Sequence, residues 1–389
     1  MSQKTSSPTT QKAAREVLLL CTAARISPEN TEHLSRILAD GIDWDYLLKL
    51  VEFHGIFPLV AHNLTANGFR DSIPESCLER LNQVYNGTLY RNMLLSNELT
   101  SIMSALNKND IATISLKGTV LAEVLYKNPA LRTSVDMDIL VHPEDISKTG
   151  VVLGELGYQQ PTIPATWEHH FHEAPYFKQA SIPFFLELHW DLEDRRLVTV
   201  PEAEIWHRAQ PLEIQGISTT VLSPEDNLLF LSTHLSKQND GLLKCLGDIA
   251  ELLRKYEGTL DWDYIVASAR SWQTSVAVYY ALKRAKDILG APVPVSSLEA
   301  LKPGLWRRFL LSFLMNREDF VTPSQVNWLR DWTAVLALGL MMKHYRQTLI
   351  VLLRQQGSWK RGAWLRTTFW VTMVLVAAVW RNGIRLVFK

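Results

Sequence analysis

Two aspartates in one extended segment are the residues of this sequence whose types and spacing first suggest chemistry. Asp136 and Asp138 lie one residue apart within the β-like segment 134–141. Side chains two apart in a strand point to the same face, so both carboxylates should project together. Two acids on an otherwise apolar strand are unfavourable unless a cation lies between them, and this pattern predicts a divalent metal site. Solvated acids on an exposed strand are the alternative. The apolar residues expected on the opposite, core-facing side are Val135, Met137, Ile139 and Val141.

A third acid is needed, because two carboxylates rarely hold a magnesium ion at a phosphate site unaided. The β-like segment 183–192 places Glu187, His189 and Asp191 on one face. Glu187 is the first candidate for the third carboxylate and Asp191 the second. We therefore predict that Asp136, Asp138 and Glu187 are the metal-binding residues and the candidates for chemistry.

A glycine turn precedes these acids. Lys117, Gly118 and Thr119 follow a β-rich run at 111–116 and begin a short helical pattern. Glycine at a strand-to-helix turn lets the backbone approach a phosphate, and the following helix directs its N–H groups at the anion. Lys117 and Arg132 could neutralise phosphate charge there, although a surface position is the alternative for Lys117. The P-loop and dinucleotide glycine patterns are absent.

Strand signals are confined to residues 109–220, and the runs 170–178 and 183–192 are predicted to pair as a hairpin. His169, His170 and His172 could bind a metal, but adjacent residues of a strand point to opposite faces, so we do not assign them.

The layout predicts an α+β fold with a small α/β unit between helical regions. The expected units are a mobile N-terminus (1–12), a helical segment (13–108), the α/β core (109–222), a helical domain (223–330) and a basic, apolar tail (331–389).

Composition agrees with a folded protein. The 389 residues are 47% hydrophobic and 21% charged, with a formal net charge of zero. The cysteines Cys21, Cys77 and Cys245 are far apart, which favours a reducing compartment and argues against a disulfide framework. The apolar run 17–24 is too short and too far from the start for a signal peptide. We expect a cytoplasmic protein.

These motifs together resemble the signature of a known family. The segments that carry the resemblance are Leu116-Lys117-Gly118, Leu125-Tyr126, Arg132 and Asp136-Met137-Asp138-Ile139-Leu140-Val141. They look like a largely uncharacterised prokaryotic nucleotidyltransferase family of the DNA polymerase beta-like superfamily. The resemblance extends through Glu187-Leu188-His189-Trp190 to the helical segment 224–249, and it includes Asp-Trp-Asp-Tyr at 43–46 and 261–264.

The resemblance implies a small mixed sheet and a role for each motif. Gly118 and Thr119 fall on the turn that holds the nucleotide phosphates, with threonine in place of the usual serine. Asp136 and Asp138 fall on the two metal-binding aspartates, and Glu187 falls on the strand whose carboxylate helps to deprotonate the acceptor. Lys117 and Arg132 complete the expected nucleotide-binding set. The gap between Thr119 and Asp136 is longer than usual, so the loop that holds Arg132 is expected to be specialised.

The implied chemistry is transfer of a nucleoside monophosphate from ATP or another nucleoside triphosphate to a hydroxyl, with two Mg²⁺ ions and release of pyrophosphate. Members of the family are encoded among surface-polysaccharide genes, so the acceptor could be a sugar, a lipid-linked molecule or a protein. Two rival functions remain: a non-catalytic scaffold that keeps the fold, and a phosphotransferase that moves the γ-phosphate.

The tail differs from the rest of the chain. No Asp or Glu follows Asp331, whereas nine Lys and Arg residues do, and they flank apolar runs at 333–342 and 367–380. The longer run is shorter than the roughly 20 residues that a spanning helix requires. Basic flanks and tryptophans favour peripheral contact of residues 332–389 with the cytoplasmic face of a membrane. A buried helix or an oligomer interface is the alternative. The segment 370–379 is too apolar to track phosphates, so we do not expect nucleic acid as a partner.

Overall fold

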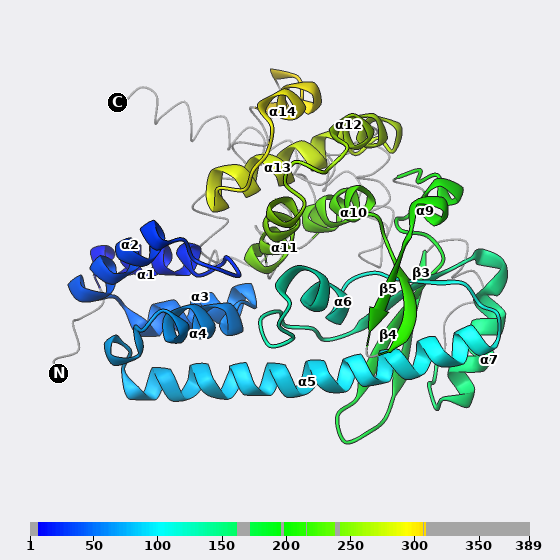
Figure 1. Ribbon diagram of the computed structural model, residues 1–389, viewed down its shortest axis with the longest axis horizontal. Coiled ribbons are helices and arrows are strands. Elements are labelled where there is room, and N and C mark those ends of the chain that lie inside the picture. The colour runs from blue at the N-terminus through cyan, green and yellow to red at the C-terminus, as the bar shows by residue number, and fades with distance from the viewer. Residues whose placement is uncertain are drawn as a thin grey trace, which may run out of the picture.

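In a computed structural model of the chain, residues 7–161, 172–195, 198–214, 216–237, 242–305 and 307–308 are described. The described elements form an elongated molecule, with the N-terminal helices at one end, the sheet at the other and the helices of residues 224–301 above the middle (Figure 1). The 34-residue helix α5 (Glu75–Lys108) runs along both parts. The tail 331–389 lies outside the described residues, and no described helix is long and apolar enough to cross a membrane.

The first three helices of the chain are preceded by residues whose side chains cap them. The Ser7 hydroxyl accepts from the N–H of Thr10, and the Thr10 side chain accepts from the N–H of Ser7. This reciprocal cap starts helix α1 at Pro8, within the segment 1–12 that the sequence predicts to be a mobile N-terminus. The helices of this region are α1 (Pro8–Leu20), α2 (Pro28–Asp40), α3 (Trp44–His54) and α4 (Phe57–Ala66), followed by the 3-10 turn η1 (Arg70–Ser72).

The described strands form one mixed, six-stranded sheet in the order β3-β4-β2-β1-β6-β5. β2 runs antiparallel to β1 and parallel to β4, while β3 and β4 form the predicted antiparallel hairpin. The strands are β1 (Thr113–Ser115), β2 (Met137–Val141), β3 (Glu173–Lys178), β4 (Phe184–His189), β5 (Gln210–Ile214) and β6 (Ile217–Val221). The predicted α+β fold is confirmed.

The strand that carries the aspartates starts later than predicted. β2 begins at Met137, because the backbone carbonyls of Ser134 and Val135 accept hydrogen bonds from the guanidinium of Arg91 on α5 and not from a neighbouring strand. Val135 is consequently 59% exposed, so its predicted place in the core is wrong. Met137, Ile139 and Val141 are buried as predicted.

The remaining helices complete two cores. They are α6 (Thr119–Leu121), the π-helical turn η2 (Ala122–Tyr126), η3 (Pro143–Asp145), α7 (Ile146–Glu155), α9 (Glu202–Arg208), α10 (Pro224–Lys237), α11 (Leu242–Lys255), α12 (Trp262–Ser271), α13 (Ser275–Leu289) and α14 (Val295–Leu301). One apolar core joins the two helical regions and contains, for example, Leu50 of α3 and Leu246 of α11.

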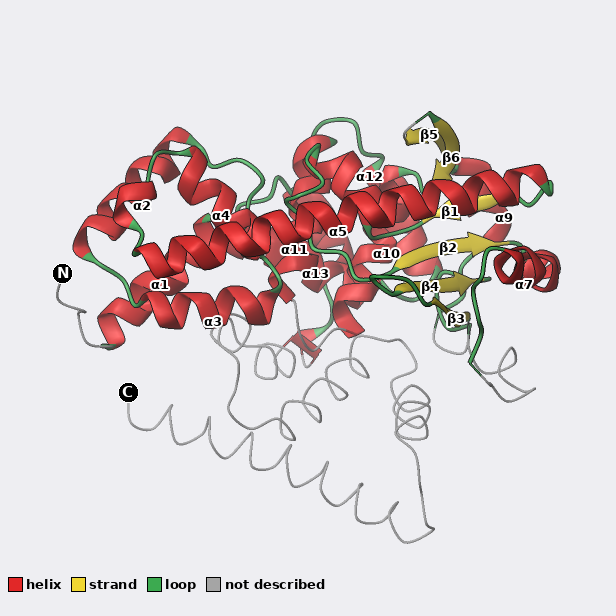
Figure 2. Cartoon of the chain, turned by 90° about the horizontal axis from the view of Figure 1, so that it is seen from below, coloured by secondary structure: helices red, strands yellow, loops and turns green. Residues whose placement is uncertain are grey.

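The second core lies between one face of the sheet and the C-terminal half of α5, and it includes Ile102, Ile139 and Leu188. Figure 2 shows α5 extending from the N-terminal helices to strands β1 and β2. Ile139 of β2 belongs to this core, whereas Leu140 belongs to the core of the helical regions. The face of β2 that carries Asp138 and Leu140 is therefore turned toward the C-terminal helices.

Candidate active site

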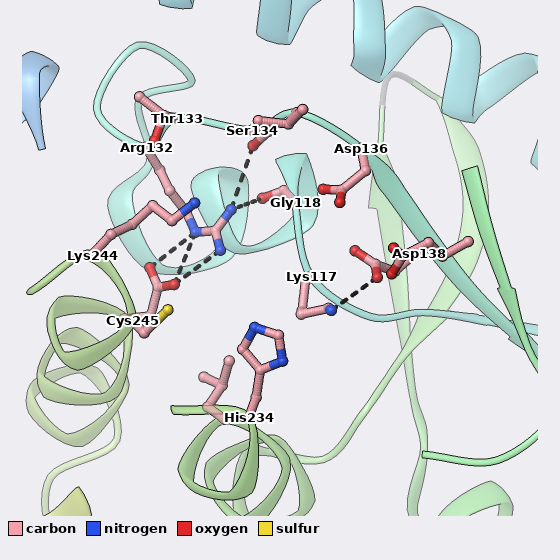
Figure 3. A pocket seen from close by; sticks show the side chains of 14 residues that line it. Lys117, Gly118, Arg132, Thr133, Ser134, Asp136, Asp138, His234, Lys244 and Cys245 are labelled. Carbon is pink, nitrogen blue, oxygen red and sulfur yellow. Dashed lines mark hydrogen bonds and ion pairs between the residues drawn. The ribbon is translucent and has the colours of Figure 1, made fainter. Parts of the chain in front are cut away.

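A pocket of about 250 Å³ lies where the sheet meets helices α10 and α11. Its walls come from the turn after β1, the loop before β2, strands β2 and β4, and the two helices (Figure 3). Six of the seven predicted site residues line it: Lys117, Gly118, Arg132, Asp136, Asp138 and Glu187. The fold thus brings together residues that are up to 70 positions apart in the sequence.

The acids meet because of the strand register. Asp138 of β2 and Glu187 of β4 are paired positions of neighbouring parallel strands, so their side chains leave the same face of the sheet. Glu187 is 36% exposed, whereas Asp138 is almost completely buried. Asp136, just before β2, points into the same pocket (Figure 3).

His189 lies beside this acid cluster. The sequence pattern places it on the same face as Glu187 but gives it no role. Its Nε2 lies 3.2 Å from Asp138 Oδ1 and 3.7 Å from Glu187 Oε2. Burial lowers the pKa of His189, but its hydrogen bond with Asp138 and the nearby carboxylates of Glu187 and Glu173 outweigh burial and raise the pKa to about 9. The i, i+2 spacing from Glu187 was the available sequence signal.

Asp191, the second candidate for the third acid, points elsewhere. It forms an ion pair with Arg195 and accepts a hydrogen bond from the N–H of Leu192. It does not line the pocket. Strand β4 ends at His189, so the alternation that seemed to align Asp191 with Glu187 stops before it. Glu187 is the acid that faces Asp138.

Lys117 is held inside the pocket. Its Nζ lies 2.9 Å from Asp138 Oδ1, and only 13% of its side chain is exposed, so it is not a surface lysine. Burial favours the neutral amine, but the carboxylates of Asp138 and Glu187 outweigh burial and raise the pKa of Lys117 above its ordinary value. Burial likewise favours neutral Asp138, but Lys117 and then His189 lower the pKa of its carboxyl well below the usual range. This charged pair is therefore retained at neutral pH.

Asp136 has a different electrostatic environment. Burial, followed by the charge of Asp138, raises the pKa of Asp136, while Lys117 and Lys244 oppose that rise. Two hard carboxylate donors in register on neighbouring strands, with a third acid in the same pocket, have the donor chemistry that Mg²⁺ prefers. The site residues therefore fit a divalent cation.

Gly118 has a conformation that requires glycine. Its φ of 62° lies in the left-handed region, and a Cβ at this position would be 3.0 Å from the backbone oxygen of Asp136. The turn after β1 is thus packed directly against the residue that begins the acid cluster. Thr119, the predicted partner of Gly118, is 8% exposed and is not among the residues that line the pocket.

Arg132 is buried and is bound by Asp248 of α11. Its Nε lies 2.9 Å and 3.1 Å from the two oxygens of Asp248, and its Nη2 lies 2.9 Å from Oδ2. The remaining Nη1 donates to the carbonyl oxygen of Gly118 at 2.9 Å. Tyr126 also donates to Asp248, at 2.9 Å. Arg132 therefore connects the glycine turn to the C-terminal helices.

The long loop that carries Arg132 is anchored from both sides. The Asn92 amide of α5 donates to the carbonyl oxygen of Arg132 at 2.6 Å, and the Thr133 hydroxyl donates to the carbonyl oxygen of Gly55 at 2.9 Å. These contacts hold the backbone between the π-helical turn and Asp136. Sequence reasoning identified the unusual length of this loop but not its partners.

Lys244, in the first turn of α11, is a pocket residue to which the sequence argument gave no role. In Figure 3 it extends toward the guanidinium of Arg132. Within the described part of the chain, it forms no ion pair or hydrogen bond, whereas Arg132 is neutralised by Asp248. A phosphate entering the pocket would therefore meet the charge of Lys244 uncompensated by a contacting acid.

The family of the chain follows from comparison with known proteins. A family described as uncharacterised nucleotidyltransferases matches residues 40–290, which include every residue of the candidate site. The chain belongs to this nucleotidyltransferase family. A comparison with curated proteins finds no match. Among solved structures, the chain is similar to an antigenic nucleotidyltransferase-like protein from Paracoccidioides brasiliensis, with 15% identity and a TM-score of 0.32 over 52% of this chain and 95% of that one.

Proposed function

We propose that this protein transfers a nucleoside monophosphate from a nucleoside triphosphate such as ATP to a hydroxyl acceptor, with release of pyrophosphate. The observation that carries this proposal is the pairing of Asp138 and Glu187 on neighbouring strands, with Asp136 in the same pocket. Membership of a nucleotidyltransferase family supports the same chemistry. We also propose that the fold belongs to the polymerase beta-like superfamily.

Asp136, Asp138 and Glu187 would hold magnesium, with two ions expected from the family resemblance. Bound magnesium supplies Lewis-acid polarisation of the α-phosphate and neutralises charge on the triphosphate. Glu187, whose side chain is 36% exposed, is placed to accept the proton of the acceptor hydroxyl. Gly118 lets the backbone approach the phosphates, and Lys244 and Lys117 neutralise their charge. Arg132 positions the carbonyl of Gly118.

The experiment is labelling of a cell extract by the purified protein with magnesium and either α-labelled or γ-labelled ATP. Transfer of the α label supports nucleotidyl transfer. Transfer of the γ label alone would instead establish a phosphotransferase, and absence of both labels would favour a scaffold. The label should appear on a sugar, a lipid-linked molecule or a protein, which fractionation of the extract distinguishes.

Two variants connect labelling to the site. Asp138→Asn removes one metal ligand and is expected to reduce transfer by at least about 10²–10³-fold. Asp191→Asn is the matched control, because Asp191 lies on the same chain segment as Glu187 but contacts Arg195 outside the pocket. Unchanged labelling in Asp138→Asn would contradict the proposed site.

We further propose that the protein is cytoplasmic and that residues 332–389 contact the membrane surface. This proposal rests on the basic flanks and apolar runs of the tail. A chain shortened after Asp331 should lose membrane association in cell fractionation. Identical fractionation of the short and full chains would show that the tail does not bind membranes.

A further inference from the structure

A second cluster of ligand-type side chains lies on the other side of His189, away from Asp138. Glu173 of β3 and His189 of β4 are paired positions of the hairpin, and His172 immediately precedes β3. We propose that His172, Glu173 and His189 form a binding site for a transition-metal ion of the zinc type, distinct from the proposed magnesium site. This inference does not rest on the proposed function.

The distances between the donor atoms match a tetrahedral site. Zinc binds nitrogen and oxygen donors at about 2.0–2.2 Å, so two donors at tetrahedral positions lie roughly 3.3–3.6 Å apart. Glu173 Oε2 lies 3.3 Å from His189 Nδ1 and 3.5 Å from His172 Nε2. Ligand atoms of all three residues lie within 4.8 Å of one another. The Glu173 carboxylate would thus supply one ligand of the tetrahedral ion, and the imidazoles of His172 and His189 would supply two others.

His189 supplies an independent observation. The residue is 2% exposed, and its Nδ1 has no hydrogen-bond partner in the described part of the structure, although it lies close to Glu173. A buried ring nitrogen without a hydrogen bond is unfavourable, and a metal ion would satisfy it. The ring's other nitrogen, Nε2, lies 3.2 Å from Asp138 Oδ1. A ligating histidine whose second nitrogen donates to a carboxylate is the common arrangement in zinc proteins.

The same imidazole could instead join Asp138 and Glu187, whose ligand atoms form a second three-residue group with His189. The two arrangements use opposite ring nitrogens, so one neutral imidazole serves only one of them. Asp138 is already paired with Lys117 and His189 Nε2, whereas Nδ1 lacks a hydrogen bond. Two imidazoles and one carboxylate also suit zinc, while an oxygen-rich set suits magnesium. The geometry therefore assigns Nδ1 to the zinc-type site and leaves Nε2–H for Asp138.

Such an ion would have a positioning effect. It would join the edge strand β3 to β4 and fix the orientation of the His189 ring, which contacts Asp138. Three protein ligands leave a fourth position for water. The ion is thus expected to stabilise the hairpin and the carboxylate orientation at the neighbouring pocket.

The test measures metal binding by the full-length chain without a histidine tag and without nucleotide. After removal of metals with a chelator, zinc is added in mildly alkaline buffer, because protons and zinc compete for imidazole nitrogens. Equilibrium dialysis should find one zinc per chain at this site, with an increase in Tm. Cobalt(II) should give the strong visible absorption of tetrahedral coordination. Retention of no zinc by the wild-type chain would overturn the proposal.

Variants identify the ligands. His172→Ala and Glu173→Gln are expected to weaken zinc binding by more than about 100-fold, because outer-shell changes alone weaken it 10–100-fold. Both side chains are partly exposed, so these variants should fold. His33→Ala is the matched control: His33 Nε2 lies 2.7 Å from Glu16 Oε1, but no third ligand completes that pair among the described residues.

Glu187→Gln separates the two possible arrangements. Zinc should stay bound in this variant if His172, Glu173 and His189 are the ligands, because Glu187 is not one of them. Loss of zinc in Glu187→Gln, or unchanged binding in His172→Ala, would overturn the assignment.

Discussion

Two buried ion pairs border the same pocket, and they are built differently. Arg132 binds both oxygens of Asp248 and also donates to the carbonyl of Gly118, while Tyr126 donates to Asp248 from another side. Lys117 pairs with a single oxygen of Asp138, Oδ1, at 2.9 Å. Further acids and His189 surround that second pair.

The difference indicates different roles. A planar guanidinium in a bidentate pair has its geometry fixed by the contacts, so Arg132 and Asp248 form a fixed link between the glycine turn and α11. An ammonium ion is a point charge on a flexible stem, and Lys117 can exchange one anion for another. Because Asp136, Asp138 and Glu187 exceed the charge of Lys117, the acid side of the pocket also has negative charge left for a metal ion.

Replacing Arg132 is the strongest way to test this comparison. Arg132→Met leaves Asp248 buried without its cation and should reduce the free energy of unfolding by about 3–5 kcal/mol, as measured by urea denaturation. Magnesium should not restore the loss, because Asp248 lies apart from the acid cluster. Arg80→Met is a suitable control, since the side chains of Arg80 and its partner Glu52 are 51% and 66% exposed, and loss of an exposed pair costs only about 0–1 kcal/mol. Equal effects of the two variants would contradict the structural role of Arg132.

Lys117→Met should have a smaller effect, and one that magnesium reverses. The variant leaves Asp138 without its closest cation, but His189 still neutralises part of the charge, so we expect a loss of about 2–4 kcal/mol. A divalent ion can replace the missing ammonium at Asp138, and binding to the folded state raises its stability. Urea denaturation with and without magnesium measures this rescue. A loss that magnesium does not reduce would show that Lys117–Asp138 is as fixed as Arg132–Asp248.

Gly118→Ala tests the turn that both pairs adjoin. Alanine at a φ of 62° is strained and would approach the carbonyl oxygen of Asp136 to 3.0 Å, so a stability loss of about 1–2 kcal/mol is expected. Nucleotide binding should weaken as well, because the displaced turn no longer presents its backbone to the pocket. Gly154→Ala is the control: Gly154 lies in α7, and a Cβ there meets no atom within 4 Å. Isothermal calorimetry and urea denaturation of both variants give the comparison.

The two pairs also differ in how far the sequence could predict them. The alternation of a strand predicted which face Asp138 and Glu187 occupy, and the family resemblance suggested that their strands lie close together; the register Asp138–Glu187 comes from the structure. Asp248 lies on a helix 116 residues from Arg132, and no local pattern specifies such a partner. Asp191 was misplaced because the end of β4 at His189 depends on tertiary contacts. Local periodicity therefore predicted the face that carries the acids. The partner of Arg132 and the position of Lys244 in the pocket depend on the packing of α11 near the sheet, which no local pattern encodes.

Replacing Asp136 should have the smallest effect on stability, and it should raise the stability where the other replacements lower it. Its folded-state pKa is raised above the ordinary value of 3.8, chiefly by burial and by the charge of Asp138. A carboxyl whose pKa is higher in the folded state contributes stability below its unfolded pKa and loses that contribution as the pH rises through the folded pKa. Ionised Asp136 thus destabilises the fold at neutral pH. Asp136→Asn should therefore be slightly more stable than the wild type at neutral pH, and the difference should disappear in acid below the ordinary pKa.

Lys244→Ala provides the opposing variant. Lys244 partly counters the raised pKa of Asp136, so its removal should raise that pKa further and reduce stability at neutral pH, but not in acid. Urea denaturation of both variants across this pH range, without magnesium, measures the two differences. A stability gain in Asp136→Asn that persists unchanged at low pH would show that its cause is packing and not the charge of Asp136. In that case Asp136 would add little unneutralised negative charge to the acid side of the pocket. The proposed difference from the fully neutralised Arg132–Asp248 pair would then be smaller.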